Sequence, residues 1–552
     1  PAIGLRFNGP TGAGESFNSN NRSLNLGTEL SRQFNVLGTE TTDIYAGATW
    51  NLGKHELKFG IDYADNEVYN AFIQRTNGDY TFQCEPGAYS FGTVTACPTN
   101  SGTITPGTYT TSAGLTGQAM SVGQRELTTL ENFQRGLPSF FRVQTPAAGR
   151  TLSDAVAIWS YANTGVFLQD TFKVTDRFNL MLGLRVDQSN VPTQPLRNAA
   201  VAAPRVAGNV TGTTLVRDSG GFSIDNTTTD GSRLVQPRLG FNWNLGTLER
   251  RTQLRGGFGL FQGAAANVWL SNPFSNTGVA LVDRNCGNFA ACRTANSGAQ
   301  VTFNPNPATQ PALGGTSPAA NVDFLAPNLE QPAVWKANLA IDAELPALPV
   351  VGQLTVSAEY LHIKNKAGIY YENLNLGGLT ATGTDGRRLF YTPQTFNPAC
   401  WAGSDFSSTA AAACAGSRTR ALSNPLFNNA LLAAKTSQGY SDAITLSISK
   451  PSQAGLGWSV AYTKTAAKEV SPLTSSTSES NWNGRGVFDP NEETLQNSNY
   501  LIKDRFNASL TWSKAFMGNY RTSVGVFYEG RRGKPYNWTY LNDLNGDGVY
   551  SN

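Results

Sequence analysis

Few residues in this chain could carry out catalysis. Only two histidines are present, His55 and His362, and neither lies in an HExxH motif. The sequence also has no GxSxG motif, which would place a nucleophilic serine at a strand-to-helix turn. A glycine-rich run at 256–259 lacks the complete GxGxxG spacing of a dinucleotide-binding loop and lies within a strand-like pattern. We therefore expect no intrinsic catalytic site and no enzyme activity.

One motif has the residue types of a metal site. Asp543, Asn545 and Asp547 alternate ahead of a glycine, which is the first half of a D-x-N-x-D-G calcium loop. Oxygen ligands at alternate positions, with glycine at the sixth, can wrap around a hard cation. The twelfth position, where a bidentate acid is expected, falls beyond Asn552. A calcium site in the loop at 543–548 and an unliganded polar turn therefore both stay open, and no other cofactor is indicated.

The six cysteines fall into three pairs that are close in sequence. The pairs are Cys84 with Cys97, Cys286 with Cys292, and Cys400 with Cys414. None has CxxC spacing, and each lies in a stretch rich in Gly, Ser, Thr and Pro. Disulfides can close such loops in an oxidising compartment such as the periplasm. We predict three local disulfides, and six unpaired loop thiols are the alternative.

Composition excludes several classes of protein. The chain has 552 residues, of which 40% are hydrophobic and only 15% charged, with a net charge of +3. This charge balance gives no basic surface of the kind that nucleic-acid binding needs, so nucleic acid is not an expected partner. No stretch approaches 18 consecutive apolar residues, which excludes membrane-spanning helices but leaves barrel strands open, because alternation dilutes their apolar signal.

The dominant pattern along the chain is a two-residue alternation of apolar and polar side chains. Its clearest example is the segment 178–187, where Leu180, Leu182 and Leu184 share one face. The other face carries Asn179 and Arg185, among others. A helix cannot produce this alternation, so the segment is predicted to be a β-strand.

Pairs of such segments, joined by short turns, predict six β-hairpins and therefore twelve strands. The hairpins are expected at 44–63, 165–187, 238–261, 335–362, 444–462 and 506–529. The links between them are long and cover 64–163, 188–233, 263–333, 365–439 and 465–503. Long structureless links argue against a compact soluble domain. Short periplasmic turns and long extracellular loops are instead typical of an all-β fold, the transmembrane antiparallel β-barrel.

Charged residues recur on the strand face opposite the apolar one. Those predicted to face the lumen, as contacts for a plug or a substrate, are Lys58, Asp62, Arg185, Asp187, Arg238, Lys336, Asp342, Glu344 and Glu359, with Asn242 beside them. A dry core could not hold so many unpaired charges, whereas a wet lumen or a polar plug accommodates them.

Aromatic residues gather near the short turns and predict an aromatic girdle at the membrane interface. They are Trp50, Phe172, Phe178, Trp243, Trp458, Trp512 and Phe516. Core aromatics of a soluble β protein are the alternative interpretation, but that interpretation leaves the asymmetry between turns and links unexplained.

Three segments of this sequence have familiar motifs. They are GVFLQDTFKVTDRFNLMLGLRVD from Gly165, PRLGFNWNLG followed by QLRGGFGLFQG, and the tail DRFNASLTWSKAFMGNYRTSVGVFYEGRRGKPYNWTYLNDLNGDG. In this order they resemble successive hairpins of TonB-dependent outer-membrane receptors, and in particular of the Oar-like subgroup. The resemblance extends from Asp43 to the end of the chain, with divergent loops.

The resemblance implies a barrel of 22 strands in the intact parent, which surrounds an N-terminal plug and follows a small β-sandwich domain. The plug, the sandwich, the TonB box and the last strand have no counterpart in this sequence. We therefore interpret residues 1–552 as an outer-membrane β-barrel domain that is incomplete at both ends.

The implied function is transport across the outer membrane of a Gram-negative bacterium. Extracellular loops would capture an unknown substrate, which would pass through a plug-gated lumen. The expected partners are outer-membrane lipid and the TonB–ExbB–ExbD complex, the latter through the missing N-terminal part. A passive porin and a surface adhesin or structural barrel are the alternatives.

Overall fold

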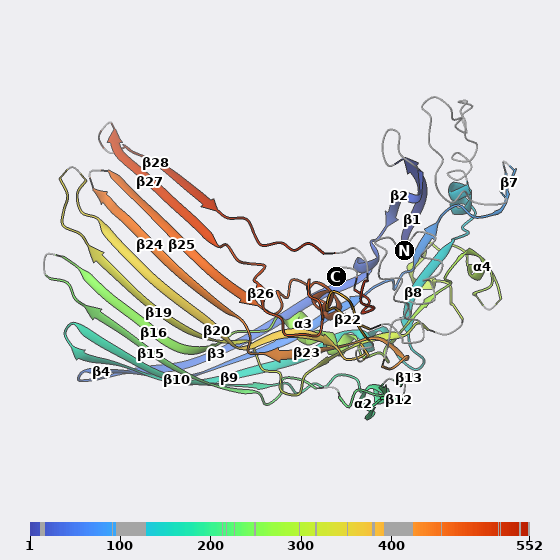
Figure 1. Ribbon diagram of the computed structural model, residues 1–552, viewed down its shortest axis with the longest axis horizontal. Helices are drawn as coiled ribbons and strands as arrows, with labels where there is room; N and C mark the ends of the chain where they lie inside the picture. Colours follow the sequence, from blue (N-terminus) through green and yellow to red (C-terminus); the bar gives the residue numbers. More distant parts are fainter. Residues whose placement is uncertain are drawn as a thin grey trace. The chain divides into compact units, whose positions relative to one another are not determined.

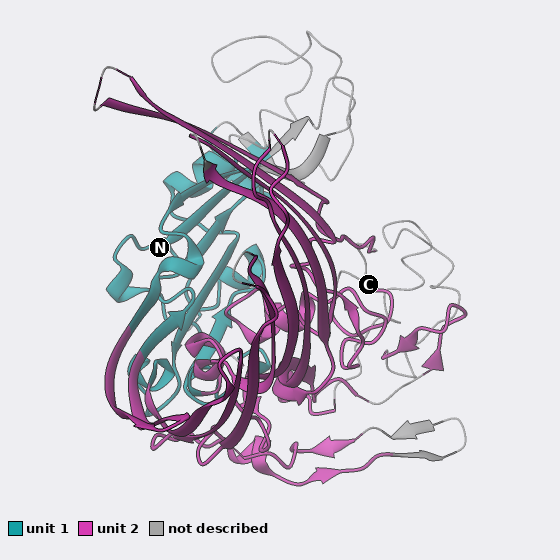
Figure 2. Ribbon diagram, turned by 90° about the vertical axis from the view of Figure 1, so that its left-hand side faces the viewer, with its two compact units in different colours: residues 1–38, 69–158, 274–321 teal, residues 39–68, 159–273, 322–552 magenta. Residues whose placement is uncertain are grey.

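A computed structural model gives the structure of this protein. It describes residues 1–10, 17–90, 92–94, 128–211, 214–216, 218–225, 227–247, 250–296, 298–314, 317–349, 351–377, 381–390, 423–453, 455–516, 518, 520–539 and 543–549. The chain divides into two compact units (Figure 2). Unit 1 comprises residues 1–38, 69–158 and 274–321, and unit 2 comprises 39–68, 159–273 and 322–552. Both are built mainly from β-strands.

The main sheet is an antiparallel meander of twelve long strands (Figure 1). From one edge to the other they are β28 (Tyr520–Arg531), β27 (Asp504–Phe516), β25 (Leu456–Glu469), β24 (Tyr440–Gln453), β20 (Thr355–Asn373), β19 (Ala333–Glu344), β16 (Thr252–Gln262), β15 (Arg233–Asn244), β10 (Phe178–Asn190), β9 (Ala157–Thr175), β4 (His55–Ile73) and β3 (Phe34–Leu52). They form the six hairpins predicted from the alternation. Within the described residues the sheet is open, with β3 and β28 as its edges.

The register of the strands gathers apolar side chains on one face of this sheet. Leu182 on β10 lies opposite Leu239 on β15, which in turn lies opposite Phe258 on β16. Exposed apolar residues on this face include Val166, Leu168, Leu182, Leu184, Val235, Leu239, Trp243, Phe258, Leu339, Ile341, Ile444, Leu446, Phe506, Leu510, Val524 and Val526. So extensive an apolar surface is not found on monomeric soluble proteins, and it is typical of a surface that faces lipid.

The opposite face of the sheet is polar even where it carries no charge. Thr445 and Thr463 are hydrogen-bonded through their hydroxyl groups at 3.0 Å, and Ser459 and Ser509 at 2.7 Å. These contacts join β24 to β25 and β25 to β27 across directly opposed positions. The sheet therefore separates an apolar face from a hydrogen-bonded polar face, as the alternation predicts.

Short turns close the hairpins at one end of the strands. In the turn between β9 and β10, the Thr175 hydroxyl accepts hydrogen bonds from the backbone N–H groups of Arg177 and Phe178, at 3.3 and 3.0 Å. Gly53 has φ +61° in the turn between β3 and β4, and Gly518 has φ +75° between β27 and β28. Glycine adopts these left-handed conformations without steric cost.

Aromatic side chains lie close to these turns. Phe178 begins β10, and its ring contacts Trp243 edge-on with a centroid separation of 5.9 Å. Trp512 and Phe516, near the end of β27, make a similar contact at 6.0 Å. Trp50 is exposed near the end of β3. The positions match those expected for an aromatic girdle at one membrane interface.

Several strands extend beyond the length needed to cross a bilayer. β3, β4, β9 and β20 each contain 19 residues, whereas about 9–11 residues suffice. β20 pairs with β24 over residues 355–364 and then with β23 (Phe427–Thr436) over residues 368–373. The expectation that the link 365–439 is without structure is therefore wrong for this part, because tertiary pairing supplies partners that local alternation does not reveal.

A carboxylate on a connecting segment fastens β20 to β23. Glu330 accepts hydrogen bonds from the ammonium groups of Lys366 on β20 and Lys435 on β23, the second at 2.9 Å. Burial alone would raise the pKa of Glu330, but the two ammonium groups outweigh it and hold this pKa below its usual value. The strand extensions are thus joined by charged groups as well as by backbone pairing.

The remaining elements are short. They are β11 (Arg205–Val206), β12 (Asn209–Thr211), β13 (Thr214–Val216), β14 (Ser219–Gly220), β18 (Ala320–Leu325), β21 (Ala381–Thr382), β22 (Arg388–Leu389), β26 (Gln496–Asn497), α2 (Ala199–Ala202), α3 (Asn267–Ser275), α6 (Ser478–Asn483) and the 3₁₀ helices at Leu30–Arg32, Leu152–Ala155 and Pro307–Thr309. No helix in the described ranges is both long and apolar enough to cross a membrane.

Unit 1 contains a second sheet with a core of its own. Its strands, in spatial order, are β17 (Leu281–Asn285), β8 (Phe140–Pro146), β5 (Asp79–Phe82), β1 (Ala2–Pro10) and β2 (Phe17–Gly27), and the hairpin β6 (Gly87–Tyr89) with β7 (Gly92–Val94) stands apart. Tyr80, Phe82 and Phe141 are fully buried, and the rings of Tyr80 and Phe141 stack with centroids 4.4 Å apart. The links 64–163 and 263–333, expected to be structureless, supply three strands of this sheet.

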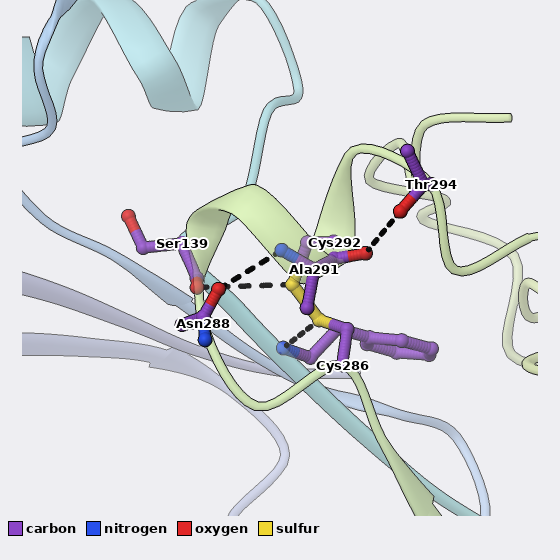
Figure 3. Close-up of a disulfide and its surroundings, with 7 residues drawn as sticks. Ser139, Cys286, Asn288, Ala291, Cys292 and Thr294 are labelled. Atoms are coloured by element: carbon purple, nitrogen blue, oxygen red, sulfur yellow. Dashed lines mark hydrogen bonds between the residues drawn. A yellow bond between two sulfur atoms is a disulfide. The ribbon is translucent and has the colours of Figure 1, made fainter. Parts of the chain in front are cut away.

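A disulfide between Cys286 and Cys292 closes a short loop, and both cysteines are buried in this core (Figure 3). Cys292 ends α4 (Phe289–Cys292), and the backbone N–H of Phe141 donates to Cys286 Sγ at 3.1 Å. This is one of the three local pairs predicted from the sequence. Cys84 is also disulfide-bonded, whereas Cys97, Cys400 and Cys414 lie outside the described residues.

We predict that replacing both Cys286 and Cys292 with serine lowers the stability of unit 1, because a closed loop of this length contributes about 2 kcal/mol in the chain-entropy description. Limited proteolysis of unreduced and reduced wild-type protein, compared with the double variant, measures the effect. Mass spectrometry of unreduced peptides tests all three pairings, and free thiols or links between distant loops would contradict the prediction.

The two faces of β10 predict opposite responses to an introduced charge. Leu182 is 49% exposed on the apolar face, so Leu182→Arg should destabilise the protein by roughly 2–4 kcal/mol near the bilayer midplane and by less near an interface. Asn179→Arg, on the polar face, should be much milder. Urea unfolding of both variants in lipid measures the difference. Equal tolerance would mean that the assigned faces are wrong.

Candidate functional site

The charged residues predicted to face a lumen share the polar face of the main sheet. In β4, Lys58 and Asp62 alternate with the exposed apolar residues Phe59 and Ile61. Registers across β10, β15, β16, β19 and β20 place Arg185, Asp187, Arg238, Lys336, Asp342, Glu344 and Glu359 on the same side, away from Leu182 and Leu239. Most of them meet in three groups on this face.

The first group is centred on Arg185 of β10. Its guanidinium donates to both carboxylate oxygens of Asp62 on β4, at 2.5 and 2.8 Å. It also donates to both oxygens of Asp187, at 2.7 and 2.6 Å. The planar fork of arginine suits such paired contacts, which are among the strongest hydrogen bonds in proteins. One guanidinium therefore compensates two carboxylates.

Asp187 is the most deeply buried acid of this group, with 3% of its surface exposed. Besides Arg185, its carboxylate accepts hydrogen bonds from Asn163 Nδ2 at 3.1 Å and from Gln236 Nε2. A buried carboxylate needs this number of donors, because an unpaired charge at such a depth is strongly destabilising.

A glycine makes the reach of Arg185 possible, and a second glycine makes room for a neighbouring ring. β9 lies between β10 and β4 in the sheet, so the Arg185 side chain crosses β9 to contact Asp62. A Cβ at Gly165 of β9 would lie only 2.1 Å from Arg185 Nη2. At Gly60 of β4, a Cβ would lie 2.9 Å from the ring of Phe167, the residue opposite Arg185. Side chains at either position would displace these groups.

The second group is centred on Arg255 of β16. Its Nε donates to Asp342 of β19 at 3.1 Å, and its Nη2 lies 3.7 Å from Glu359 of β20. The hydroxyl of Ser357 donates to the other oxygen of Asp342 at 2.6 Å. As with Arg185, one arginine compensates two acids from different strands.

The third group has a different character, because it contains cations alone. The guanidinium of Arg238 lies over the ring of Phe261 at 4.6 Å, and the ammonium group of Lys336 lies 5.6 Å from the same ring centroid. Within the described part of the chain, neither cation forms an ion pair. Of the other predicted residues, Lys58 pairs with Glu56 at 3.2 Å, and Glu344 accepts the backbone N–H of Arg251 at 2.9 Å.

A comparison with known protein families identifies the architecture that carries this polar face. Residues 6–530 match the outer membrane beta barrel domain. The chain belongs to this family. Membership places the protein in the outer membrane of a Gram-negative bacterium and agrees with the exposed apolar face of the sheet. No curated protein matches the sequence.

Several solved structures align with this barrel protein at low similarity. The copper transporter OprC aligns with 9% identity over 89% of this chain and 43% of its own, with a TM-score of 0.36. The FrpB iron transporter of Neisseria meningitidis has the same coverages and TM-score with 10% identity. The ferric enterobactin receptor of Pseudomonas aeruginosa aligns with 12% identity over 96% of this chain and 44% of its own, at 0.38. This chain thus spans less than half the length of these proteins.

Several residues of the barrel's polar face were not predicted from the sequence. Arg255 was not among the predicted charges, although its neighbours Leu254 and Gly256 already alternate with it. Gln236 and Asn163 were also missed, because uncharged amides give no signal until their partner, Asp187, is placed beside them.

Both histidines lie on the apolar face of the barrel sheet, each beside an aspartate. His55 Nδ1 is 2.8 Å from Asp170 on β9, and His362 Nδ1 is 2.8 Å from Asp442 on β24. The hydroxyl of Tyr360 also donates to Asp442, at 2.7 Å. Asp170 lies directly opposite Leu182 and two residues from Leu168, so it shares the apolar face with both. These pairs therefore stand apart from the charges of the polar face.

The candidate calcium loop is closed by its own hydrogen bonds. The Asp543 carboxylate accepts the backbone N–H groups of Gly546 and Gly548, at 2.7 and 3.0 Å. Asp547 accepts the N–H of Val549 at 2.7 Å, and Asn545 is fully buried. The described residues hold no group of three or more His, Cys, Asp or Glu side chains placed to bind a metal. Calcium binding here stays a prediction.

A calcium titration distinguishes the two interpretations of this loop. If it binds calcium, millimolar Ca²⁺ should raise the melting temperature of the wild-type protein but not of Asp543→Asn, because carboxylate oxygens are the preferred ligands. Mg²⁺ at the same concentration controls for ionic strength. An equal response of both proteins would indicate a polar turn.

Gly165 and Gly183, both on the polar face, should differ in their tolerance of an added methyl group. Gly165→Ala should displace Arg185 and destabilise the protein by about 1–3 kcal/mol, the usual cost of overpacking. Gly183→Ala is the matched control. A Cβ there would lie 3.6 Å from its nearest neighbour, Arg238 Cβ, which is an ordinary contact. This substitution should therefore change the stability by less than about 0.5 kcal/mol. Urea unfolding in lipid compares them. Equal effects would contradict the role assigned to Gly165.

Proposed function

We propose that this chain is the barrel portion of a TonB-dependent transporter that imports a substrate across the outer membrane. In the intact parent, the meander would close into a barrel of 22 strands around an N-terminal plug. The proposal rests on membership of the outer membrane beta barrel family, together with the order of the hairpin motifs that resemble Oar-like receptors. The protein would act without chemistry of its own.

The polar face supports this proposal by its distribution of charge. A barrel that encloses a plug needs an inner wall that is polar yet rigid, since the plug must move against it without drawing wall residues along. Arg185 and Arg255 each hold two acids in fixed positions. Such paired charges give the lumen a polar, hydrated inner wall without a large net charge.

The proposed partners follow from the two faces and the two ends of the strands. Outer-membrane lipid would cover the apolar face. The long links at the ends of the strands opposite the short turns would form the extracellular capture surface for a substrate that is not yet known. Energy would come from the TonB–ExbB–ExbD complex, acting through an N-terminal part outside this sequence.

Conductance and uptake measurements test the transport mechanism. In planar bilayers, the full-length protein should show no stable open pore, because the plug blocks the lumen. A passive porin would conduct without any energy source. In cells, uptake of an identified substrate should require both this protein and TonB. Uptake that persists without TonB, or binding to surfaces without uptake, would favour the porin or the adhesin instead.

The placement of the turns predicts the topology in the membrane. Epitope tags inserted near Gly53, Thr175 or Gly518 should be periplasmic. Tags near Ser112, Thr213 or Ser407, which lie outside the described residues, should be exposed at the cell surface. Antibody labelling of intact and permeabilised cells measures this. Labelling of the Gly53 tag in intact cells would overturn the proposed orientation.

A further inference from the structure

Arg238, Lys336 and Phe261 form a small group that we call the cradle, in which two cations of the polar face contact one aromatic ring. Arg238 on β15 lies directly opposite Gly259 on β16, and Gly259 lies directly opposite Lys336 on β19. The three residues thus form one row across three strands, and the central position has no side chain. The two cations therefore come from the strands on either side of β16.

An aromatic ring forms one wall of this cradle. Phe261 follows Gly259 by two residues on the same face, and both cations lie within 6 Å of its ring. A Cβ at Gly259 would come within 3.2 Å of both Arg238 Cγ and the Phe261 ring, so glycine lets these groups approach each other. Contact with the ring holds the guanidinium and ammonium groups in place without neutralising them.

The next row on the same face is already occupied by side chains. Gly240, Gly257 and Asn338 lie opposite one another on β15, β16 and β19. A Cβ at Gly240 would lie 2.8 Å from Met181 Cε, and a Cβ at Gly257 would lie 3.3 Å from Asn338 Oδ1. Met181 and the Asn338 amide therefore border the cradle on this side.

The absence of an acid distinguishes this row from its neighbours on the same face. Arg185 and Arg255 each contact two carboxylates, whereas in the described part of the chain Arg238 donates to the amide oxygen of Gln236, at 3.4 Å. The Nε of Arg238 is buried without a hydrogen-bond partner. Across the described residues, no carboxylate lies within ion-pair distance of Arg238 or Lys336. A bound carboxylate would compensate charges that no acid of the described residues pairs with.

We propose that Arg238 and Lys336 form a binding site for a carboxylate group. The guanidinium fork would bind one carboxylate in a bidentate manner and Lys336 would add a point charge. The proposal rests on the proposed function in that the polar face lines a lumen. Two sources could supply the group, namely an acidic side chain of the polypeptide that fills the lumen and a soluble anionic substrate.

A calorimetric titration with citrate tests the soluble source. In the purified full-length protein, the wild type should bind citrate, and the double variant Arg238→Gln/Lys336→Gln should lose at least about tenfold in affinity, as expected for charged hydrogen bonds. Lys58→Gln is the matched control, since it removes one charge from the same face at a residue already paired with Glu56. Exchanging the cations, by Arg238→Lys/Lys336→Arg, should retain binding.

Carbodiimide cross-linking tests the polypeptide source, because this reagent joins a lysine amine to a carboxylate in direct contact with it. A cross-link from Lys336 to an acid outside the main sheet supports the proposal and identifies the partner segment. A cross-link to an acid of the main sheet overturns it, since the charge would already be compensated. If the double variant fails to fold, as judged by heat-modifiability on gels, Lys336→Gln alone serves for the titration.

The two experiments together decide the proposal. It is overturned if Lys336 forms no cross-link and citrate binding is either absent or equal in the wild type and the charge-removed variant. Neither measurement involves transport or TonB. Failure of the uptake experiment would therefore leave the carboxylate site standing, and failure of the carboxylate site would leave the transport proposal standing.

Discussion

The constraint on which this structure depends is that hydrocarbon offers no hydrogen bonds to a protein backbone. Each unsatisfied N–H or C=O group costs several kcal/mol there, so only continuous pairing allows strands to cross. The twelve strands of the main sheet meet this constraint by pairing with their neighbours in the sheet, apart from the outer edges of β3 and β28 in the described residues. The same constraint divides the side chains into two sets. Those that face lipid must be apolar, as with Leu182, Leu239 and Phe258, and the polar ones must share the opposite face.

Because the polar side chains share one face, carboxylates from neighbouring strands come close together and repel each other. Arginine side chains compensate this repulsion, and glycine leaves the space that they need. Asp62 and Asp187 would repel each other on a shared surface, and Arg185 removes the repulsion by binding both. This is possible only because Gly165 leaves space above β9. Arg255 acts similarly on Asp342 and Glu359. The row containing Arg238 and Lys336 has no acid within ion-pair distance among the described residues, and this is where we propose that a carboxylate binds.

Outside the twelve-stranded sheet, the chain relies on the forces that stabilise soluble proteins. Unit 1 has a core of buried aromatic rings around Tyr80 and Phe141, and this core includes a disulfide. The extension of β20 pairs with β23, and Glu330 fastens the two through Lys366 and Lys435. Long links are therefore partly folded, and a capture surface built on them would be held by packing and ion pairs rather than by the barrel strands alone.

The sequence by itself determined the features that depend on neighbours along the chain. Alternation located the six hairpins and the faces of Leu182 and Arg185, because a strand repeats every two residues, and proximity suggested the pairing of Cys286 with Cys292. Only the tertiary structure decided which distant residues meet. Arg185 and Asp62 are separated by 123 positions, and their contact requires that β9 lie between β10 and β4 with glycine at the crossing. The pairing of β23 with β20 and the sheet of unit 1 were likewise hidden. Strand neighbours and register arise from long-range pairing, which local alternation does not encode.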